Sequence, residues 1–187
     1  MPTTTLVETW TYQRMVDELP PETPYELFDG ELIDNTMSPA PNFQHQHISG
    51  ELEFLFREFC KKTKIGRIFD APFDVIFDKN NVTQPDILYI SNENMKNMGK
   101  QGFFGTPELI VEIISPRSFY DDQVRKKDLY ERFGVQEYWI IEPANQVIEV
   151  FELLDKKYEL FSYVAEEGIA KSKLLNGFEV DSKEIFI

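Results

Sequence analysis

Leu109-Ile110-Val111-Glu112-Ile113-Ile114-Ser115 is a run of aliphatic residues with one carboxylate near its middle. A run of β-branched and leucine residues without polar alternation is typical of a strand that is buried on both faces. An ionised carboxylate in such a strand is costly unless a cation, a metal ion or several hydrogen bonds compensate for its lost hydration. The sequence therefore predicts that Glu112 has a specific task and that other parts of the chain supply its partners.

The residues that follow predict a strand, helix, strand unit. The strand at 108–114 is stopped by Ser115-Pro116, because proline disfavours continuation of a central ladder. A helix at about 120–133 ends before Gly134, and a second strand follows at 137–141. Tight connections of this kind predict a right-handed parallel crossover, in which the helix packs back over the first strand.

Periodicity and turn signals predict the elements on either side of this unit. Helices are expected at 11–19 and at 43–62, the second capped by Asn42, and hairpins at 25–28 with 31–33, around Asp29-Gly30, and at 147–153 with 158–163. Short strands are expected near 67–69, 73–77 and 86–90, with a polar turn at 78–83 and a loop or short helix at 91–107. We therefore expect a single domain over residues 1–187, of mixed α/β class, with a central mixed β-sheet flanked by helices.

The composition is that of a folded globular protein. Of 187 residues, 42% are apolar and 14% aromatic, enough to bury a substantial core. The first ten residues, MPTTTLVETW, lack the basic and apolar blocks of a signal peptide, and no apolar run is long enough for a membrane span. The single cysteine, Cys60, permits no internal disulfide and fits a reducing compartment. These features predict a soluble, cytoplasmic protein with no membrane partner.

The charge balance bears on nucleic-acid binding. The net charge is −14, from 19 basic and 33 acidic residues, whereas phosphate contacts normally draw their affinity from lysine and arginine. Basic residues do gather at 61–67 and at 125–127, where they either contact phosphates or form solvated surface. The overall charge argues against a general DNA binder and leaves local contacts open.

The helix of the predicted crossover carries a candidate cation for Glu112. Projection at about 100° per residue places Asp122 and Lys126 within the apolar stripe that includes Leu129 and Tyr130. One interpretation is an i, i+4 ion pair at the edge of the stripe, with the lysine extended towards water. The other is that Lys126 approaches Glu112, because this helix packs over the strand that carries the carboxylate.

Two further residues are candidates for the same site. Asp86 follows Pro85 at the start of a predicted strand, where it is either a turn residue or faces a cleft. Beside Glu112 it forms a pair of carboxylates, whose mutual repulsion a divalent cation relieves. His45 lies on the apolar face of the second predicted helix, as either a hydrogen-bonded core residue or a site residue. Because His47 is about 200° away around that helix, the two histidines cannot easily share one metal ion.

The sequence lacks the motifs of three other common kinds of site: a structural zinc site, a nucleotide-binding loop and a nucleophile elbow. One cysteine and two histidines provide no ligand set for a structural zinc ion. Gly99, Gly102 and Gly105 lack the spacing and the preceding strand of a nucleotide-binding loop, and Ser115-Pro116 is not a nucleophile elbow.

Pro85-Asp86, Glu112 in a hydrophobic strand and Lys126 on the next helix together resemble the PD-(D/E)XK nuclease superfamily. Over nearly its full length the chain is similar, more closely, to the Uma-two family of restriction endonucleases. The matching segments, in chain order, are YELFDGEL at 25–32, MSP at 37–39 with His45 after it, QPD at 84–86, VEIISP at 111–116, the series Asp122, Lys126 and Tyr130, and GVQEYWIIEP at 134–143. Their joint order is far more specific than any one motif.

The resemblance implies a restriction-endonuclease-like core and a metal-dependent endonuclease that hydrolyses DNA. In this interpretation Asp86, Glu112 and the backbone carbonyl of Ile113 hold one Mg²⁺ or Mn²⁺ ion, both hard cations that prefer oxygen ligands. The superfamily motif places a lysine two residues after the acid, where this chain has Ile114. Lys126 on the adjacent helix is expected to take its place, as a group that orients water or stabilises charge on the phosphate.

Four supporting residues complete this hypothesis. Asp122 and Tyr130, one turn on either side of Lys126, are expected to set its position, and His45 and Glu26 are expected to line the cleft. DNA is the expected substrate, and a homodimer would provide the two sites that cutting both strands requires.

Two other hypotheses stay open. The acidic composition also fits a catalytically inactive nucleic-acid-binding or protein-interaction module built on a nuclease fold. Alternatively, Glu112 and Lys126 form only a buried ion pair, which apolar residues of similar size often replace without loss of stability.

Overall fold

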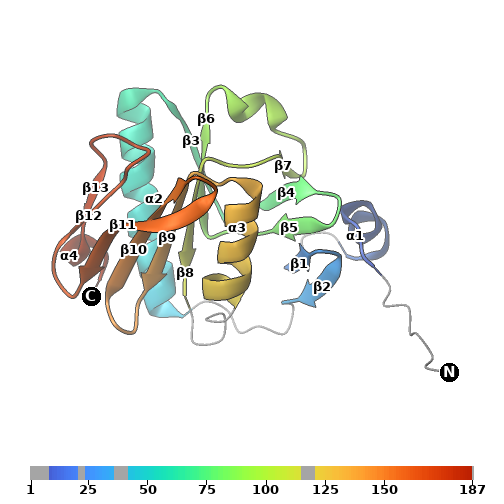
Figure 1. Cartoon of the computed structure of the whole chain (residues 1–187), viewed down its shortest axis with the longest axis horizontal. Helices are drawn as coiled ribbons and strands as arrows, with labels where there is room; N and C mark the ends of the chain where they lie inside the picture. The colour runs from blue at the N-terminus through green and yellow to red at the C-terminus, as the bar shows by residue number, and fades with distance from the viewer. Residues whose placement is uncertain (1–8, 21–23, 36–41, 115–120, 187) are drawn as a thin grey trace.

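A six-stranded mixed β-sheet forms the centre of the protein, with strand order β11-β10-β9-β8-β6-β3 (Figure 1). The computed structural model describes residues 9–20, 24–35, 42–114 and 121–186, and only the backbone of 121–123. The strands of this sheet are β3 (Gly66–Asp70), β6 (Ile87–Ser91), β8 (Leu109–Ile113), β9 (Glu137–Glu142), β10 (Val147–Leu154) and β11 (Lys157–Ala165). β8 runs parallel to β9 and antiparallel to β6, which confirms the predicted mixed sheet and parallel crossover.

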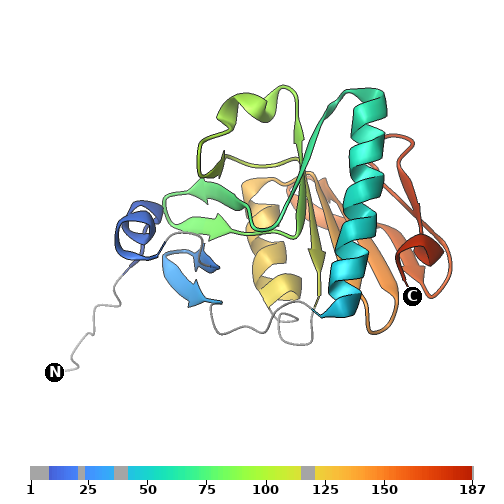
Figure 2. The same ribbon diagram turned by 180° about the vertical axis from the view of Figure 1, so that it is seen from behind.

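Helices cover both faces of this sheet, as Figures 1 and 2 show from opposite sides. The long helix α2 (Phe43–Thr63) and the short α4 (Ser182–Ile185) lie on one face, and α3 (Lys127–Phe133) lies on the other. Ile48, Leu52 and Phe56 of α2 pack against Val111 and Trp139 of the sheet. Asn42 caps α2 as predicted, because its Oδ1 accepts a hydrogen bond of 2.9 Å from the third residue of the helix.

A second sheet packs on the α3 side, with strand order β2-β1-β5-β4-β7. Its strands are β1 (Tyr25–Phe28), β2 (Glu31–Asp34), β4 (Asp74–Asp78), β5 (Asn81–Thr83) and β7 (Gly102–Phe104), and α1 (Tyr12–Glu18) packs beside it. Asp29 and Gly30 join β1 to β2 with φ values of 51° and 82°. Positive φ at both turn residues is what the Asp-Gly pair predicts for a two-residue hairpin. Phe28 and Val75 of this sheet share one core with Ile110 of β8.

Several elements differ from the sequence predictions. The predicted polar turn at 78–83 contains β5, whose three residues are all buried. The segment at 91–107, predicted as a loop or a short helix, does contain the short helix η1 (Asn94–Asn97), but it also contains the strand β7. The C-terminal pair β12 (Ile169–Lys171) and β13 (Glu179–Asp181) was not predicted. The single helix expected at 120–133 is a π-helical segment, η2 (Asp121–Lys126), followed by α3. No helix among the described residues has the length and hydropathy to cross a membrane.

β9 carries a second buried glutamate, Glu137, which is fully enclosed on the α2 side of the sheet. Its Oε1 accepts hydrogen bonds from the Trp139 indole and the Ser172 hydroxyl, both at 2.7 Å. Its Oε2 accepts from the backbone N–H groups of Lys173 at 2.6 Å and Leu174 at 2.8 Å. Four donors therefore compensate for its burial, and Glu137 ties the C-terminal segment to the sheet.

Candidate active site

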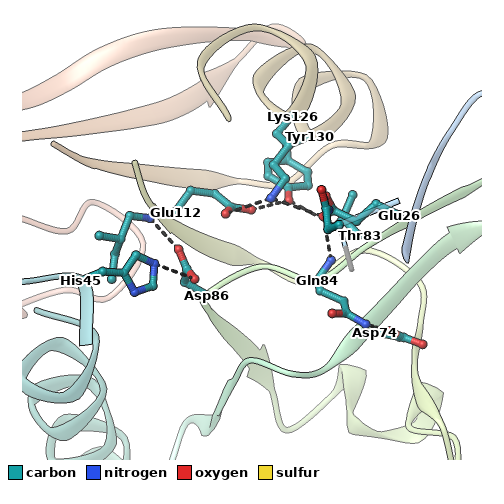
Figure 3. Close-up of polar contacts among 11 residues, drawn as sticks. Glu26, His45, Asp74, Thr83, Gln84, Asp86, Glu112, Lys126 and Tyr130 are labelled. Carbon is teal, nitrogen blue, oxygen red and sulfur yellow. Dashed lines mark hydrogen bonds and ion pairs between the residues drawn. The ribbon is translucent and has the colours of Figure 1, made fainter. Parts of the chain in front are cut away.

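The candidate site lies where β8 and β6 approach each other on the α3 side of the central sheet (Figure 3). Side chains alternate along β8, so that Glu112 shares its face with Ile110 and Ile114, which both pack on the α3 side. The antiparallel register pairs Ile87 with Val111. Continued by one residue beyond this pair, the same register places Asp86 opposite Glu112. The two carboxylates predicted from the sequence are therefore neighbours across β6 and β8.

Glu112 has two partners on the helix that follows β8. Its side chain is 3% exposed; Oε2 lies 3.1 Å from the Lys126 Nζ, and Oε1 accepts a hydrogen bond of 2.7 Å from the Tyr130 hydroxyl. Burial, followed by the charge of Glu112, raises the pKa of Tyr130 well above its usual value, so Tyr130 remains a neutral donor. The predicted approach of Lys126 to Glu112 is therefore confirmed.

Lys126 also reaches a second carboxylate. Its Nζ lies 3.3 Å from Oε1 of Glu26 on β1, and the Lys126 and Glu26 side chains are each 8% exposed. Lys126 is the last residue of η2, whose wider π-helical winding departs from the α-helical projection made from the sequence. The backbone of Asp122 belongs to the same segment, but its side chain lies outside the described residues. Its predicted support of Lys126 therefore stays a prediction.

Glu26 is held by two further donors. Its Oε1 accepts a hydrogen bond of 3.0 Å from the backbone N–H of Gln84, and its Oε2 accepts one of 3.2 Å from the side-chain amide of Asn35. The sequence predicted only that Glu26 lines a cleft. Its contact with Lys126 depends on the packing of β1 against η2, which no local pattern indicates.

Asp86 is fixed by groups from two other elements. Its Oδ2 accepts a hydrogen bond of 2.7 Å from the backbone N–H of Ile113, and its Oδ1 lies 3.2 Å from Nε2 of His45. The β6–β8 register, continued past its last pair, places Pro85 opposite Ile113. Because proline has no amide hydrogen, this position of β6 offers no donor to the Ile113 carbonyl. The Pro85-Asp86 pair thus ends the ladder beside Glu112.

His45 and His47 follow the directions that the helix projection predicts. The His45 side chain is 16% exposed and faces Asp86, whereas His47 stacks on Phe43 with ring centroids 6.3 Å apart.

The structure brings most of the predicted site residues together, through direct contacts or through Ile113. These residues are Glu26, His45, Asp86, Glu112, Lys126 and Tyr130. Thr83, which contacts the Tyr130 hydroxyl at 3.2 Å, was not foreseen because it lies within the predicted turn.

The chemistry of the donors fits a hard divalent cation. Asp86, Glu112 and the Ile113 carbonyl offer only oxygen, which Mg²⁺ and Mn²⁺ prefer. Two carboxylates, Glu26 and Glu112, contact the ammonium of Lys126, and Asp86 lies opposite Glu112 in the sheet register. No group of three or more His, Cys, Asp or Glu side chains within the described residues forms a ready-made metal centre. A bound ion would therefore rely on two carboxylates and backbone or water oxygens.

Loss of the Tyr130 hydroxyl is expected to destabilise the protein measurably. Tyr130→Phe removes the hydrogen bond to buried Glu112 and leaves that oxygen without this donor, at a cost of about 1–3 kcal/mol. Denaturant unfolding of the wild type and the variant measures this difference. Tyr163→Phe is the control, because Tyr163 is 55% exposed and its hydroxyl should contribute less than about 0.5 kcal/mol. Equal stability of the two variants would contradict the assigned role of Tyr130.

A mixed sheet with acidic residues on adjacent strands and a lysine on the helical segment that follows fits the nuclease-like class of protein that the sequence resemblance implies. A sequence model of the Uma2 family, described as "Putative restriction endonuclease", matches residues 11–183. The chain therefore belongs to the Uma2 family. A crystal structure of "a putative nuclease belonging to DUF820" from Anabaena variabilis ATCC 29413 superposes with a TM-score of 0.75 at 19% sequence identity, covering 94% of this chain and 97% of the other. This likeness establishes the fold. No match was found among curated protein sequences.

Proposed function

We propose that this protein is a metal-dependent endonuclease that hydrolyses DNA phosphodiester bonds. The observation that carries the proposal is the position of Glu112, a carboxylate buried on a central strand, opposite Asp86 and in contact with Lys126. Family membership and the nuclease-like fold support the same class of reaction. Asp86, Glu112 and the Ile113 carbonyl would hold Mg²⁺ or Mn²⁺.

The residues of the site have separate tasks in this proposal. A bound divalent cation supplies Lewis acidity towards the phosphate and lowers the pKa of a water molecule. Lys126 places a positive charge beside the reacting phosphate, where it stabilises the negative charge that grows during attack. Tyr130 fixes the orientation of Glu112 by donating to Oε1. His45 and the Ile113 N–H hold the two oxygens of Asp86.

Cleavage of supercoiled plasmid tests the proposal. The wild type is expected to nick plasmid in Mg²⁺ or Mn²⁺ and to lose this activity in excess chelator. Calorimetric titration with Mn²⁺ should show a binding event that Asp86→Asn abolishes, because the variant loses one anionic ligand. Cleavage at an undiminished rate in chelator would refute metal dependence.

The contacts of the carboxylates favour one alternative, an inactive binding module. Both oxygens of Glu112 and both of Asp86 already contact a polar group of the protein, and the net charge of −14 offers little attraction for a duplex. A wild type that neither binds Mn²⁺ nor cleaves plasmid would favour this alternative.

We propose that the activity belongs to one restriction-endonuclease-like domain over residues 1–187, that the protein works in the cytoplasm and that DNA is its partner. Double-strand cleavage would need two sites, which a homodimer supplies. Sedimentation with and without a short duplex measures whether two copies assemble.

A further inference from the structure

We infer that Glu26 is a positioning residue, which retains the ammonium of Lys126 in the site so that Glu112 is available as a ligand. The inference rests on the proposed function, since it concerns the same reaction. Glu26 comes from the second sheet, whereas Glu112 comes from the central sheet and Lys126 from the crossover (Figure 3). Three parts of the fold therefore meet at a single ammonium group.

The Glu26 carboxylate is a fixed acceptor. The Glu26 side chain is 8% exposed, and its Oε1 receives both the Gln84 backbone N–H at 3.0 Å and the Lys126 Nζ at 3.3 Å. Its Oε2 receives the Asn35 amide at 3.2 Å. A backbone donor and a side-chain donor on opposite oxygens restrict rotation of the carboxylate. Glu26 therefore presents Oε1 to Lys126 in a set direction.

The same ammonium competes for the proposed ligand oxygen. Lys126 Nζ lies 3.1 Å from Oε2 of Glu112, and Tyr130 occupies Oε1, so both oxygens of Glu112 have donors. If Glu112 were the only partner of the ammonium, the two positive groups would compete for the same carboxylate. Either the ammonium would move away from the site or it would prevent the metal ion from binding to Glu112. Because Glu26 offers a second carboxylate of similar burial, the ammonium keeps a partner and stays beside the reacting phosphate.

Asp74 provides a matched control for Glu26. It accepts a hydrogen bond of 2.7 Å from the side-chain amide of Gln84, the residue whose backbone N–H binds Glu26. Burial raises the pKa of Asp74, and the charge of Glu26 adds to the effect. The structure gives no contact between Asp74 and Lys126 among the described residues. Asp74→Asn thus removes a neighbouring carboxylate and leaves the Glu26–Lys126 contact in place.

Plasmid cleavage by a double-mutant cycle tests the inference. Glu26→Gln is expected to lower kcat about 10–100-fold, the usual cost of losing a residue that orients a site, with KM nearly unchanged. Asp74→Asn should stay close to wild type. In a Lys126→Gln background, Glu26→Gln should cause no further loss, because the group it positions is gone. The inference would be overturned if the fold reductions in kcat of Glu26→Gln and Lys126→Gln multiplied in the double variant. An unchanged kcat in Glu26→Gln would also overturn it.

Two measurements without catalysis separate this inference from the proposed function. Glu26→Gln should weaken Mn²⁺ binding about tenfold in calorimetry, because Lys126 loses its contact with Glu26 and competes more strongly for the Glu112 oxygen, whereas Asp74→Asn should not. If the wild type neither binds Mn²⁺ nor cleaves DNA, the proposed function fails. The Glu26–Lys126 contact is then judged by thermal unfolding in chelator. Additive effects of Glu26→Gln and Lys126→Gln on the midpoint would refute the contact as well.

Discussion

Lys126→Met is expected to lower the free energy of unfolding by about 3–5 kcal/mol, because it leaves two buried carboxylates without the cation that they share. The side chains of Glu26 and Glu112 are 8% and 3% exposed, and Lys126 contacts both. Removing one carboxylate leaves the ammonium with the other. Glu112→Gln alone should therefore cost less than Lys126→Met. Chemical denaturation in chelator measures all three proteins.

The neighbouring lysine provides the control for this prediction. Lys127 lies with its Nζ 3.4 Å from the centre of the Phe151 ring, and burial lowers its pKa. Its ammonium supports a cation–π contact without holding buried acids, so Lys127→Met should cost less than about 2 kcal/mol. Similar losses in the two variants would mean that Lys126 has no special electrostatic role.

The same measurement addresses the hypothesis that Glu112 and Lys126 are only an ion pair. That hypothesis predicts that replacing both residues by apolar ones is neutral or stabilising. The contact of Lys126 with Glu26 changes the expectation, because the double replacement leaves Glu26 buried without its cation. We therefore expect Glu112→Leu combined with Lys126→Met to unfold at a lower temperature than the wild type. A higher unfolding temperature would favour the ion pair alone.

The largest effect on activity is expected for Glu112→Gln. The amide keeps the size of the side chain and can still accept from Tyr130, but it removes the negative charge proposed to ligand the metal ion. The cleavage rate should fall at least about 1000-fold, which corresponds to about 4 kcal/mol of barrier. Plasmid nicking under single-turnover conditions measures this change.

Glu137→Gln is the matched control, because it alters a buried glutamate on the adjacent strand and the opposite face of the sheet. The four hydrogen bonds of Glu137 are structural, so its loss should lower the unfolding midpoint and leave cleavage by the folded protein near the wild-type rate. If Glu112→Gln retained wild-type cleavage, the assignment of Glu112 as a ligand would be wrong.

Local signals explain most of what the sequence predicts correctly. The aliphatic run around Glu112 indicates a buried strand, and the need to compensate its charge points to Lys126, which the structure places 3.1 Å away. The Asp29-Gly30 pair and the Asn42 cap act through hydrogen bonds and dihedral angles within a few residues. Such features require no knowledge of distant parts of the chain.

The features that the sequence did not reveal depend on distant pairing. β5 has one apolar residue, Val82, between Asn81 and Thr83, and the buried side chain of Asn81 bonds to Asp78 and to the backbone N–H of Asp29. Hydrophobic alternation cannot indicate a strand whose polar groups are satisfied in this way. Glu26 meets Lys126 only because two sheets and η2 pack together. The predicted contributions of Met37-Ser38-Pro39 and Ser115-Pro116 lie outside the described residues.

The two faces of the central sheet suggest how the protein can be engineered. On the α2 face the core consists of apolar residues such as Ile48, Leu52 and Phe56, with Glu137 bonded only to structural groups. The charged residues proposed for chemistry lie mainly on the α3 face. Substitutions that improve packing under α2 beyond its first turn, which carries His45, should therefore raise heat resistance without altering turnover, so that stability and activity can be optimised separately.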